Sequence, residues 1–185
     1  DLENVFTSWD IISGDVKLAE NILIYDEAGD HTAMQSAEIA IEKGSTVEFM
    51  TPDRLISSEI MGMNLTPYLK NLQNKKITYS IAKRLIDVSI KGNKLNATIG
   101  SDYDENFKHN SIYDQIFLNY GVKPLDELYF NLVSFSKNEG EVNYSKFIKG
   151  ETQNIIKNKN NKFNLYRIGD AVSSRNIHAA IYDAL

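Results

Sequence analysis

One stretch of the sequence, residues 21–50, indicates the fold class: NILIYDEAGDHTAMQSAEIAIEKGSTVEFM. It begins and ends with compact apolar runs, NILIY and TVEFM, which are typical of buried strands. Between them, apolar residues recur at helical spacing from Ala33 to Ile41, and Gly44 follows as a helix stop. A strand, a tight turn, a helix and a strand in this order form a βαβ unit, so the two strands are predicted to be parallel neighbours.

Downstream of this unit, the pattern changes to an alternation of apolar and polar residues. It runs over residues 86–90 and again over residues 95–99, with Gly92 and Asn93 at the turn between them. This pattern predicts an antiparallel hairpin with one solvent-facing side.

The remaining elements are predicted from shorter signals. Thr66 followed by Pro67 is typical of a helix start. A continuous apolar run at residues 112–118 predicts an interior strand that is covered on both faces. A short helix, an exposed polar loop, a last strand and a final amphipathic helix, capped near Ser174 or Asn176, are predicted in turn over residues 124–133, 157–164, 165–168 and 177–185.

These elements together predict the fold class. Parallel strands that alternate with helices, with one antiparallel hairpin as a crossover, indicate an α/β protein with a three-layer dinucleotide-binding (Rossmann-like) fold and a mainly parallel sheet.

Composition excludes several classes of function. The 185 residues carry a net charge of −5, which argues against binding to a nucleic-acid backbone. The absence of cysteine excludes disulfides, thiolate zinc sites and cysteine-ligated iron–sulfur clusters within this chain. No apolar run approaches the roughly 20 residues that cross a bilayer, and no signal peptide is visible, so a cytoplasmic protein without membrane contact is expected. Because the sequence opens without an initiator Met and closes on an apolar helical segment, we expect it to be a piece of a longer polypeptide.

The turn after the first strand is the first candidate ligand site. In a working dinucleotide site this turn reads G-x-G-x-x-G, so that the backbone can approach the pyrophosphate at the helix N-terminus. Here Ala28, Asp30 and Ala33 stand at the three glycine positions. Asp30 places a carboxylate where phosphate would sit, and like charges repel.

Other residues around this turn leave two interpretations open. The acid expected about 20 residues on, for the ribose hydroxyls, falls near the uncharged Thr51. Arg54, close by, could meet a 2′-phosphate, and Gly29 and His31 complete the turn. The chain therefore has either a retained fold that has lost its nucleotide site or an atypical NAD(P)H site.

Metal binding at the same turn is the weaker hypothesis. Asp26, Glu27, Asp30 and His31 lie within six residues, but acids at a helix start are favoured by the helix dipole alone, by about 0.3–1 kcal/mol each. No metal site is therefore predicted. His31 and His178 are interpreted as cap or surface residues, and His109 is placed in a polar loop.

The second candidate ligand site is Gly169-Asp170. A strand that ends in Gly-Asp lets a ligand approach the glycine backbone and offers a carboxylate to sugar or ribityl hydroxyls. The helix start that follows, at Arg175, Asn176, Ile177 and His178, would then face a diphosphate.

Several segments of the sequence resemble one enzyme group closely. This group is the NADH:flavin oxidoreductase family built like trimethylamine dehydrogenase and 2,4-dienoyl-CoA reductase, and the N-methylproline and dimethylglycine demethylase-type members are the most similar. The resemblance covers nearly the whole chain, and it is carried by residues 8–10, 25–31, 51–54, 124–130, 167–171 and 175–185.

The resemblance implies a domain organisation. Family members have an N-terminal (β/α)8 barrel with FMN and a 4Fe–4S cluster, followed by a FAD- or ADP-binding domain that a pyridine-nucleotide-type domain interrupts. Residues 1–20 would end the first part of the FAD/ADP-binding domain, and residues 21–120 would be the inserted NAD(P)-type domain. Residues 121–162 would connect it to residues 163–185, the second part of the FAD/ADP-binding domain.

The resemblance also implies partners, cofactors and site residues. Gly169 and Asp170 match the motif that contacts FAD or ADP, and Arg175 to His178 match the helix start beside it. Trp9 is expected either on this FAD/ADP side or as an ordinary core anchor. The barrel of the same polypeptide would hold FMN, the cluster and the amine substrate, and the parent would be a homo-oligomer.

The expected function follows from these implications. The chain would be a nucleotide-binding piece of a flavoenzyme that oxidises, and so demethylates, a small N-methylated amine, and none of its residues would be catalytic. Two alternatives stay open: a flavin reductase that takes hydride from NAD(P)H, and a structural module whose nucleotide sites are empty.

Overall fold

The computed structural model describes residues 2–184, which divide into two compact units, residues 2–121 and residues 122–184. The first unit holds the eight strands of the described residues, and the second holds short helices and extended segments. No helix between residues 2 and 184 is long and apolar enough to span a membrane.

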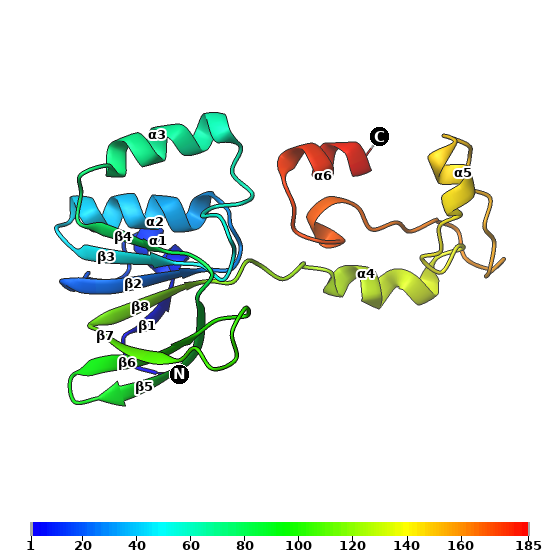
Figure 1. Ribbon diagram of the computed structural model, residues 1–185. Coiled ribbons are helices and arrows are strands. Elements are labelled where there is room, and N and C mark those ends of the chain that lie inside the picture. The colour runs from blue at the N-terminus through cyan, green and yellow to red at the C-terminus, as the bar shows by residue number, and fades with distance from the viewer. Residues whose placement is uncertain (1, 185) are drawn as a thin grey trace. The chain divides into compact units, whose positions relative to one another are not determined.

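Five parallel strands form the central sheet of the first unit, in the spatial order β1-β8-β2-β3-β4 (Figure 1). The predicted βαβ unit is confirmed, because β2 and β3 are parallel neighbours and one helix, α2 (His31–Glu42), lies between them in the chain. The strands are β1 (Val5–Thr7), β2 (Asn21–Asp26), β3 (Thr46–Met50), β4 (Ile77–Ser80) and β8 (Gln115–Asn119).

A second, antiparallel sheet is formed by β5 (Arg84–Lys91), β6 (Lys94–Gly100) and β7 (His109–Tyr113). Its first two strands are the predicted hairpin, which is confirmed by the pairing of β5 with β6. The third strand was not predicted, and His109 begins it rather than lying in a loop.

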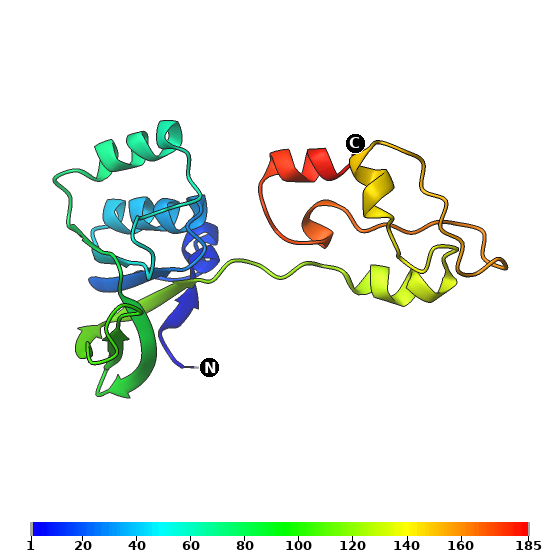
Figure 2. The ribbon, with the colours of Figure 1, turned by 45° about the vertical axis from the view of Figure 1, so that its right-hand side comes forward.

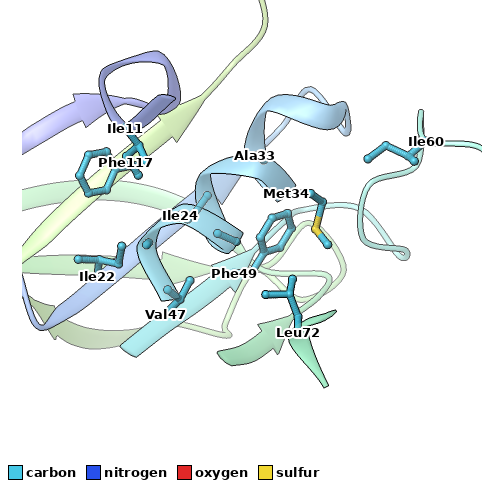
Figure 3. Close-up of a cluster of buried hydrophobic side chains, with 12 residues drawn as sticks. Ile11, Ile22, Ile24, Ala33, Met34, Val47, Phe49, Ile60, Leu72 and Phe117 are labelled. Atoms are coloured by element: carbon cyan, nitrogen blue, oxygen red, sulfur yellow. The ribbon is translucent and has the colours of Figure 1, made fainter. Parts of the chain in front are cut away.

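The two faces of the parallel sheet are covered differently, which gives the predicted three layers (Figures 1 and 2). One face packs against the helices α1 (Ser8–Ser13), α2 and α3 (Gly62–Leu72). The opposite face packs against the antiparallel sheet, through residues such as Leu23 and Tyr25 of β2 and Leu95 of β6. Because β2 is covered on both faces, its residues Ile22–Tyr25 are fully buried. Figure 3 shows the helix-side core, where Phe49 of β3 and Met34 of α2 belong to one cluster.

Two predictions in this unit were wrong. Residues 112–118 do not form one strand: Ile112 and Tyr113 end β7, and the parallel strand β8 begins at Gln115. The apolar run is continuous because two strands of different sheets follow each other across Asp114, whose backbone N–H donates to the carbonyl of Asn21.

The helix predicted to start at Thr66 and Pro67 starts earlier. α3 begins at Gly62, and Pro67 lies inside it. Proline has no backbone N–H, so the carbonyl four residues before Pro67 lacks its helical partner. The first turns of α3 are exposed, so water can bind this carbonyl, and the proline is tolerated there.

The second unit consists of α4 (Glu127–Leu132), the 3-10 turn η1 (Val133–Phe135), α5 (Tyr144–Ile148), the 3-10 turn η2 (Gly169–Ala171) and α6 (Ile177–Asp183). The helix predicted within residues 124–133 is confirmed as α4, and the final helix is confirmed as α6, with Asn176 as its N-cap.

The strand predicted at residues 165–168 is absent from this described segment. The backbone N–H of Leu165 donates to Asn138 Oδ1 at 2.8 Å, and Asn138 Nδ2 donates to the Leu165 carbonyl at 2.8 Å. The backbone groups of Leu165 are therefore satisfied by a buried amide side chain instead of a neighbouring strand.

Candidate nucleotide-binding site

The carboxyl ends of β2 and β8 form the first candidate site. On one side of β2 lie β3 and β4, and on the other side lie β8 and β1. The order in which the chain adds strands to the sheet therefore reverses between β2 and β8. In open α/β sheets, ligands bind at this switch point, outside the carboxyl ends of the strands. Two buried polar residues stand there opposite each other in register, Asp26 at the end of β2 and Asn119 at the end of β8.

Asp26 accepts hydrogen bonds from the turn that follows it. Its Oδ1 atom accepts from the backbone N–H of Ala28 at 3.1 Å, from the backbone N–H of Gly29 at 2.9 Å and from Asn119 Nδ2 at 2.9 Å. Its Oδ2 atom is buried and has no hydrogen-bond partner among residues 2–184. The amide groups of the turn are thus directed inward, toward a side chain of the protein itself.

Burial dominates the ionisation of Asp26. It raises the pKa of the carboxyl group, and the charge of Asp30 raises the pKa further, while the donors on Asn119, Gly29 and Ala28 lower it. The net direction is upward, because the cost of removing the charge from water outweighs the donated hydrogen bonds.

Asp30 caps the helix that follows. Its Oδ1 atom accepts from the backbone N–H of Thr32 at 2.9 Å and from Asn119 Nδ2 at 3.0 Å. An N-cap carboxylate satisfies a free amide at a helix start and is favoured by the helix dipole. The carboxylate of Asp30 therefore occupies the N-terminus of α2, and Asn119 links it to Asp26.

The loop after β3 lies against this turn. The backbone N–H of Glu59 donates to the carbonyl of Gly29 at 3.0 Å. Gly29 has a φ of +68°, and a Cβ at this position would lie 2.7 Å from Ser58 Oγ and 3.2 Å from the Ser58 backbone nitrogen. Glycine is required here by its backbone conformation and by the close approach of the loop.

A charged cluster lies beside the switch point. Glu27 Oε1 accepts from the Tyr25 hydroxyl at 2.6 Å and pairs with Arg84 at 2.7 Å, and Arg84 also donates two bonds of 2.7 Å to Asp102. Burial raises the pKa of Tyr25, and the bond to Asp102 raises the pKa of Arg84. Because the carboxylates of Glu27 and Asp102 both bind Arg84, its guanidinium already has its partners within the protein. No local pattern in the sequence indicates this cluster, since Glu27 and Arg84 are 57 residues apart.

The other predicted residues of this site lie in varied surroundings. Thr51 is buried, and its hydroxyl oxygen accepts from the backbone N–H of Asp53 at 3.2 Å. Arg54 is exposed in the loop after β3, and no ion pair of it is found within residues 2–184. His31 is also exposed, with Nδ1 3.1 Å from the Tyr68 hydroxyl of α3. No group of three or more His, Cys, Asp or Glu side chains in the described part of the chain could hold a metal ion.

The second candidate site lies in the second unit, at the turn η2. The backbone N–H of Gly169 donates to Asp183 Oδ2 at 3.1 Å, and the same oxygen pairs with Arg175. Gly169 has a φ of +57°, and a Cβ there would lie 3.4 Å from the Cβ of Ala180. Asp170 is exposed, and its carboxylate makes no side-chain hydrogen bond to another described residue, so it is available to a ligand hydroxyl.

Two of the residues at the start of α6 already have partners within the second unit. Asn176 accepts from the backbone N–H of Ala179 at 3.0 Å, and Arg175 is neutralised by Asp183. Ile177 and His178 are exposed.

Trp9 and Arg167 lie in surroundings that differ from the predicted ones. Trp9, in α1, is 55% exposed, so its interpretation as a core anchor was wrong. Arg167, which was not predicted as a site residue, pairs with Asp126 at 2.6 Å and lies over the rings of Tyr129 and Phe130. This contact fixes the segment before Gly169 to α4.

Comparison with curated proteins finds similar sequences along almost the whole chain. The probable N-methylproline demethylase of Rhizobium meliloti is 51% identical over 183 residues, which are 99% of this chain and 27% of that protein. The N,N-dimethylglycine/sarcosine dehydrogenase of Chromohalobacter salexigens is 31% identical over 98% of this chain and 26% of its own length. The chain thus spans about a quarter of the length of these relatives. No family model matches it.

Comparison with solved structures shows the fold. The 6-hydroxypseudooxynicotine amine oxidase of Pseudomonas geniculata superposes with a TM-score of 0.67 at 20% identity, over 99% of this chain and 24% of that one. Histamine dehydrogenase from Rhizobium sp. 4-9 gives 0.61 at 14% identity, over 97% and 25%. Thioredoxin reductase of Lactococcus lactis gives 0.61 at 15% identity, over 96% and 54%.

These findings define the class of the protein. The parallel sheet with its antiparallel crossover is the α/β fold of the dinucleotide-binding domains of flavin-dependent reductases. Within that class, the resemblance found in the sequence is confirmed: the chain is homologous to one portion of N-methylproline demethylase and of dimethylglycine/sarcosine dehydrogenase.

Proposed function

We propose that this chain is the nucleotide-domain portion of a flavin oxidoreductase that oxidises, and thereby demethylates, a small N-methylated amine. The names of the two relatives support this proposal, because both describe action on N-methylated amino acids. Sequence identity of 51% along 99% of the chain makes the first relative the stronger support.

In the proposed polypeptide, this chain and a further part have different roles. FMN and a 4Fe–4S cluster would lie in an N-terminal barrel, where the amine is oxidised, and this chain would pack against that barrel. Residues 21–120 would form an inserted NAD(P)-type domain. Residues 163–185 would belong to the flanking FAD/ADP-binding domain, connected through residues 121–162. The N-terminal segment packs within the first unit, since β1 pairs with β8 and Ile11 of α1 lies in its core.

The inserted domain is proposed not to bind NAD(P)H. The observation that carries this proposal is the closed turn after β2, where Asp26 accepts the amides of Ala28 and Gly29, and Asp30 accepts the amide of Thr32. A pyrophosphate would need these donors and would meet two carboxylates instead. The residues at this turn therefore do not fit the dinucleotide.

The residues at η2 do fit a flavin or adenine nucleotide. The Asp170 carboxylate is exposed and free to accept from ribityl or ribose hydroxyls. The lack of a Cβ on the buried Gly169 lets the turn lie close to Ala180 of α6. FAD or ADP bound there would supply redox or structural roles to the parent protein. This chain's residues would only bind and orient it.

Calorimetric titration of the 185-residue chain with NADH tests the proposal. No heat of binding is expected at millimolar nucleotide. A dissociation constant near about 10 μM would contradict the proposal, since that affinity requires about 7 kcal/mol of favourable contacts.

A second candidate function rests on Arg54. This exposed guanidinium follows β3, at the place where the 2′-phosphate of NADPH lies in dinucleotide domains. It favours a reductase that passes hydride from NADPH to a flavin. The same titration with NADPH tests this alternative, and tight binding of NADPH alone would support it.

A further inference from the structure

The antiparallel sheet has one long uncovered edge, the strand β5. This strand pairs only with β6 and forms one edge of the sheet (Figure 1). It has eight residues, whereas the other edge strands, β1, β4 and β7, have three, four and five. Within residues 2–184, β5 makes no backbone hydrogen bond to a loop or turn. An unpaired strand edge of this length is a template for pairing with another chain.

Every second residue of β5 points its backbone N–H and C=O groups away from β6. In a hairpin closed by a two-residue turn, the residues that flank the turn are bonded to each other, and bonded and non-bonded pairs alternate from there. Here the turn is formed by residues 92–93, and the flanking pair is Lys91 and Lys94. The backbone groups that face the open edge are therefore those of Ile90 and Val88.

The solvent-facing side of β5 carries two opposite charges. Asp87, Ser89 and Lys91 are exposed and alternate along the strand with Val88 and Ile90. Val88 packs against the core between the two sheets, so the alternation places the three polar side chains on the opposite, outer side.

Neither charge has a partner of opposite sign in the described part of the chain. No ion pair of Asp87 or Lys91 is found within residues 2–184. Lys91 stands opposite Lys94 in the hairpin, and like charges in directly opposed positions are unfavourable. Lys94 is neutralised by Asp114 at 2.8 Å, which leaves Lys91 without a carboxylate.

We propose that β5 pairs with β5 of a second copy of this chain, antiparallel and centred on Ser89, so that two three-stranded sheets join into one sheet of six strands. In this register, Asp87 of each copy lies opposite Lys91 of the other, on the outer side. Val88 of each copy lies opposite Ile90 of the other, and these are the residues whose backbone groups face the open edge. The inference goes beyond the proposed function, because it involves no nucleotide.

Charge complementarity selects this register. A shift by two residues keeps the backbone bonds but places Asp87 opposite Ser89 or Asn93, so both ion pairs are lost. A shift by one residue would oppose outward-facing backbone groups with groups that are already bonded to β6. The β-bulge between Leu85 and Asp87 ends the regular part of the strand, so residues 87–91 form the pairing segment. Ile90, which is 58% exposed, would gain an apolar contact with Val88 of the second copy.

Sedimentation equilibrium of the 185-residue chain at low salt tests the inference. A strand pair of this length is smaller than a standard protein interface, so we expect a weak dimer with a dissociation constant of about 10–100 μM. Asp87→Lys and Lys91→Asp should each weaken the dimer about tenfold, because either variant brings four like charges together across the strand pair. A chain that stays monomeric up to about 1 mM would overturn the inference.

Mixing the two variants distinguishes the proposed pairing from a general loss of structure. In a mixed dimer, the two positive side chains of Asp87→Lys face the two carboxylates of Lys91→Asp, so an equimolar mixture should regain the affinity of the unsubstituted chain within about threefold. A mixture that associates no more tightly than its two components would overturn the inference.

Lys108→Asp is the matched control. It makes the same change in net charge as Lys91→Asp, at an exposed lysine that directly precedes β7. The dissociation constant of this variant should stay within about threefold of the unsubstituted value, since its charge lies outside the proposed strand pair. Equal losses of affinity in Lys108→Asp and Lys91→Asp would overturn the inference.

Amide hydrogen exchange locates the contact on the strand. The amides of Val88 and Ile90 should exchange at least about threefold more slowly at 500 μM chain than at 5 μM, and the amide of Ser89, which faces β6, should not change. An absence of concentration-dependent protection in β5 would overturn the inference. None of these results bears on the proposed function, which fails separately if the chain binds NADH.

Discussion

Two turns of this protein, at residues 26–30 and at residues 169–171, combine a glycine with an aspartate at the start of a helix, but they use the pair in opposite ways. In the first turn, Asp26 and Asp30 accept the amides of the turn and of α2, and Asp26 is fully buried. In the second turn, Asp170 is exposed, and the Gly169 amide is taken by Asp183. The comparison teaches that the carboxylate of a Gly-Asp pair can bind the protein's own backbone, as Asp30 does, or be left without a side-chain partner among the described residues, as Asp170 is.

The largest expected difference between the two turns is in stability. Asp26→Ala leaves the buried backbone N–H of Gly29 without an acceptor, while the Ala28 N–H keeps the Asn119 carbonyl and Asn119 Nδ2 keeps Asp30. One unpaired buried donor costs about 1–3 kcal/mol, so a loss of that size is expected. Asp170→Ala should change the free energy of unfolding of the 185-residue chain by less than about 0.5 kcal/mol. Urea unfolding of both variants measures the contrast, and equal losses would break the comparison.

The second prediction concerns nucleotide affinity in the full-length parent polypeptide. Asp170→Ala should remove a charged hydrogen-bond acceptor from the FAD or ADP site, which weakens binding by about 1.5–3 kcal/mol, or roughly ten- to a hundredfold. Nucleotide released on denaturation, after equilibration at limiting nucleotide, measures occupancy. FMN content serves as the control and should not change. Unchanged FAD or ADP occupancy would show that the second turn is only a turn.

The third prediction compares two glycines with positive φ, Gly29 in the first turn and Gly14 at the end of α1. Gly29→Ala should cost about 2 kcal/mol or more, because φ is +68° and the new Cβ would lie 2.7 Å from Ser58 Oγ. Gly14→Ala is the matched control: its φ is +78° and no atom lies within 4 Å of the Cβ position, so about 1 kcal/mol is expected. If the two variants unfold at the same urea concentration, the loop after β3 does not press on the turn.

The smallest expected effect is a pH dependence. Burial raises the pKa of Asp26 above its ordinary value of 3.8, so the folded state holds this proton to higher pH than the unfolded state does. The contribution of Asp26 to stability is therefore greatest below pH 3.8 and is lost as the pH rises through the raised pKa of the folded state. Asp102 and Asp114 act in the opposite direction, since their bonds to Arg84 and Lys94 lower their pKa values. The difference in the free energy of unfolding between the unsubstituted chain and Asp26→Asn removes the contributions of Asp102 and Asp114, which both proteins share. That difference should fall with rising pH, and a rise would contradict the assignment.

The sequence predicted the parts of the fold that depend on local periodicity. The βαβ unit and the hairpin follow from apolar spacing within about 30 residues, and both are present. Residues 112–118 and 165–168 were predicted wrongly, because apolar content alone does not show which chain segment will satisfy the backbone. At Leu165 the decisive partner is Asn138, 27 residues away.

The candidate site could be predicted only in part for the same reason. The degenerate glycine pattern at Ala28, Asp30 and Ala33 was visible in the sequence, and it directed attention to Asp30. The residue that closes the turn is Asp26, and its partner Asn119 lies 93 residues further on. A contact of that range depends on the register of β2 and β8, which the sequence pattern does not encode.

The amide resonances of Ala28 and Gly29 test the central claim most directly, because these two groups would have to leave Asp26 to bind a diphosphate. They can be followed by NMR in the 185-residue chain during titration with NADH and with NADPH. We predict that neither resonance shifts up to about 5 mM of either nucleotide, a concentration that would reveal binding as weak as about 3 kcal/mol. A saturable shift of both resonances with a dissociation constant near about 10 μM would contradict the claim that the turn is filled by the protein's own carboxylates.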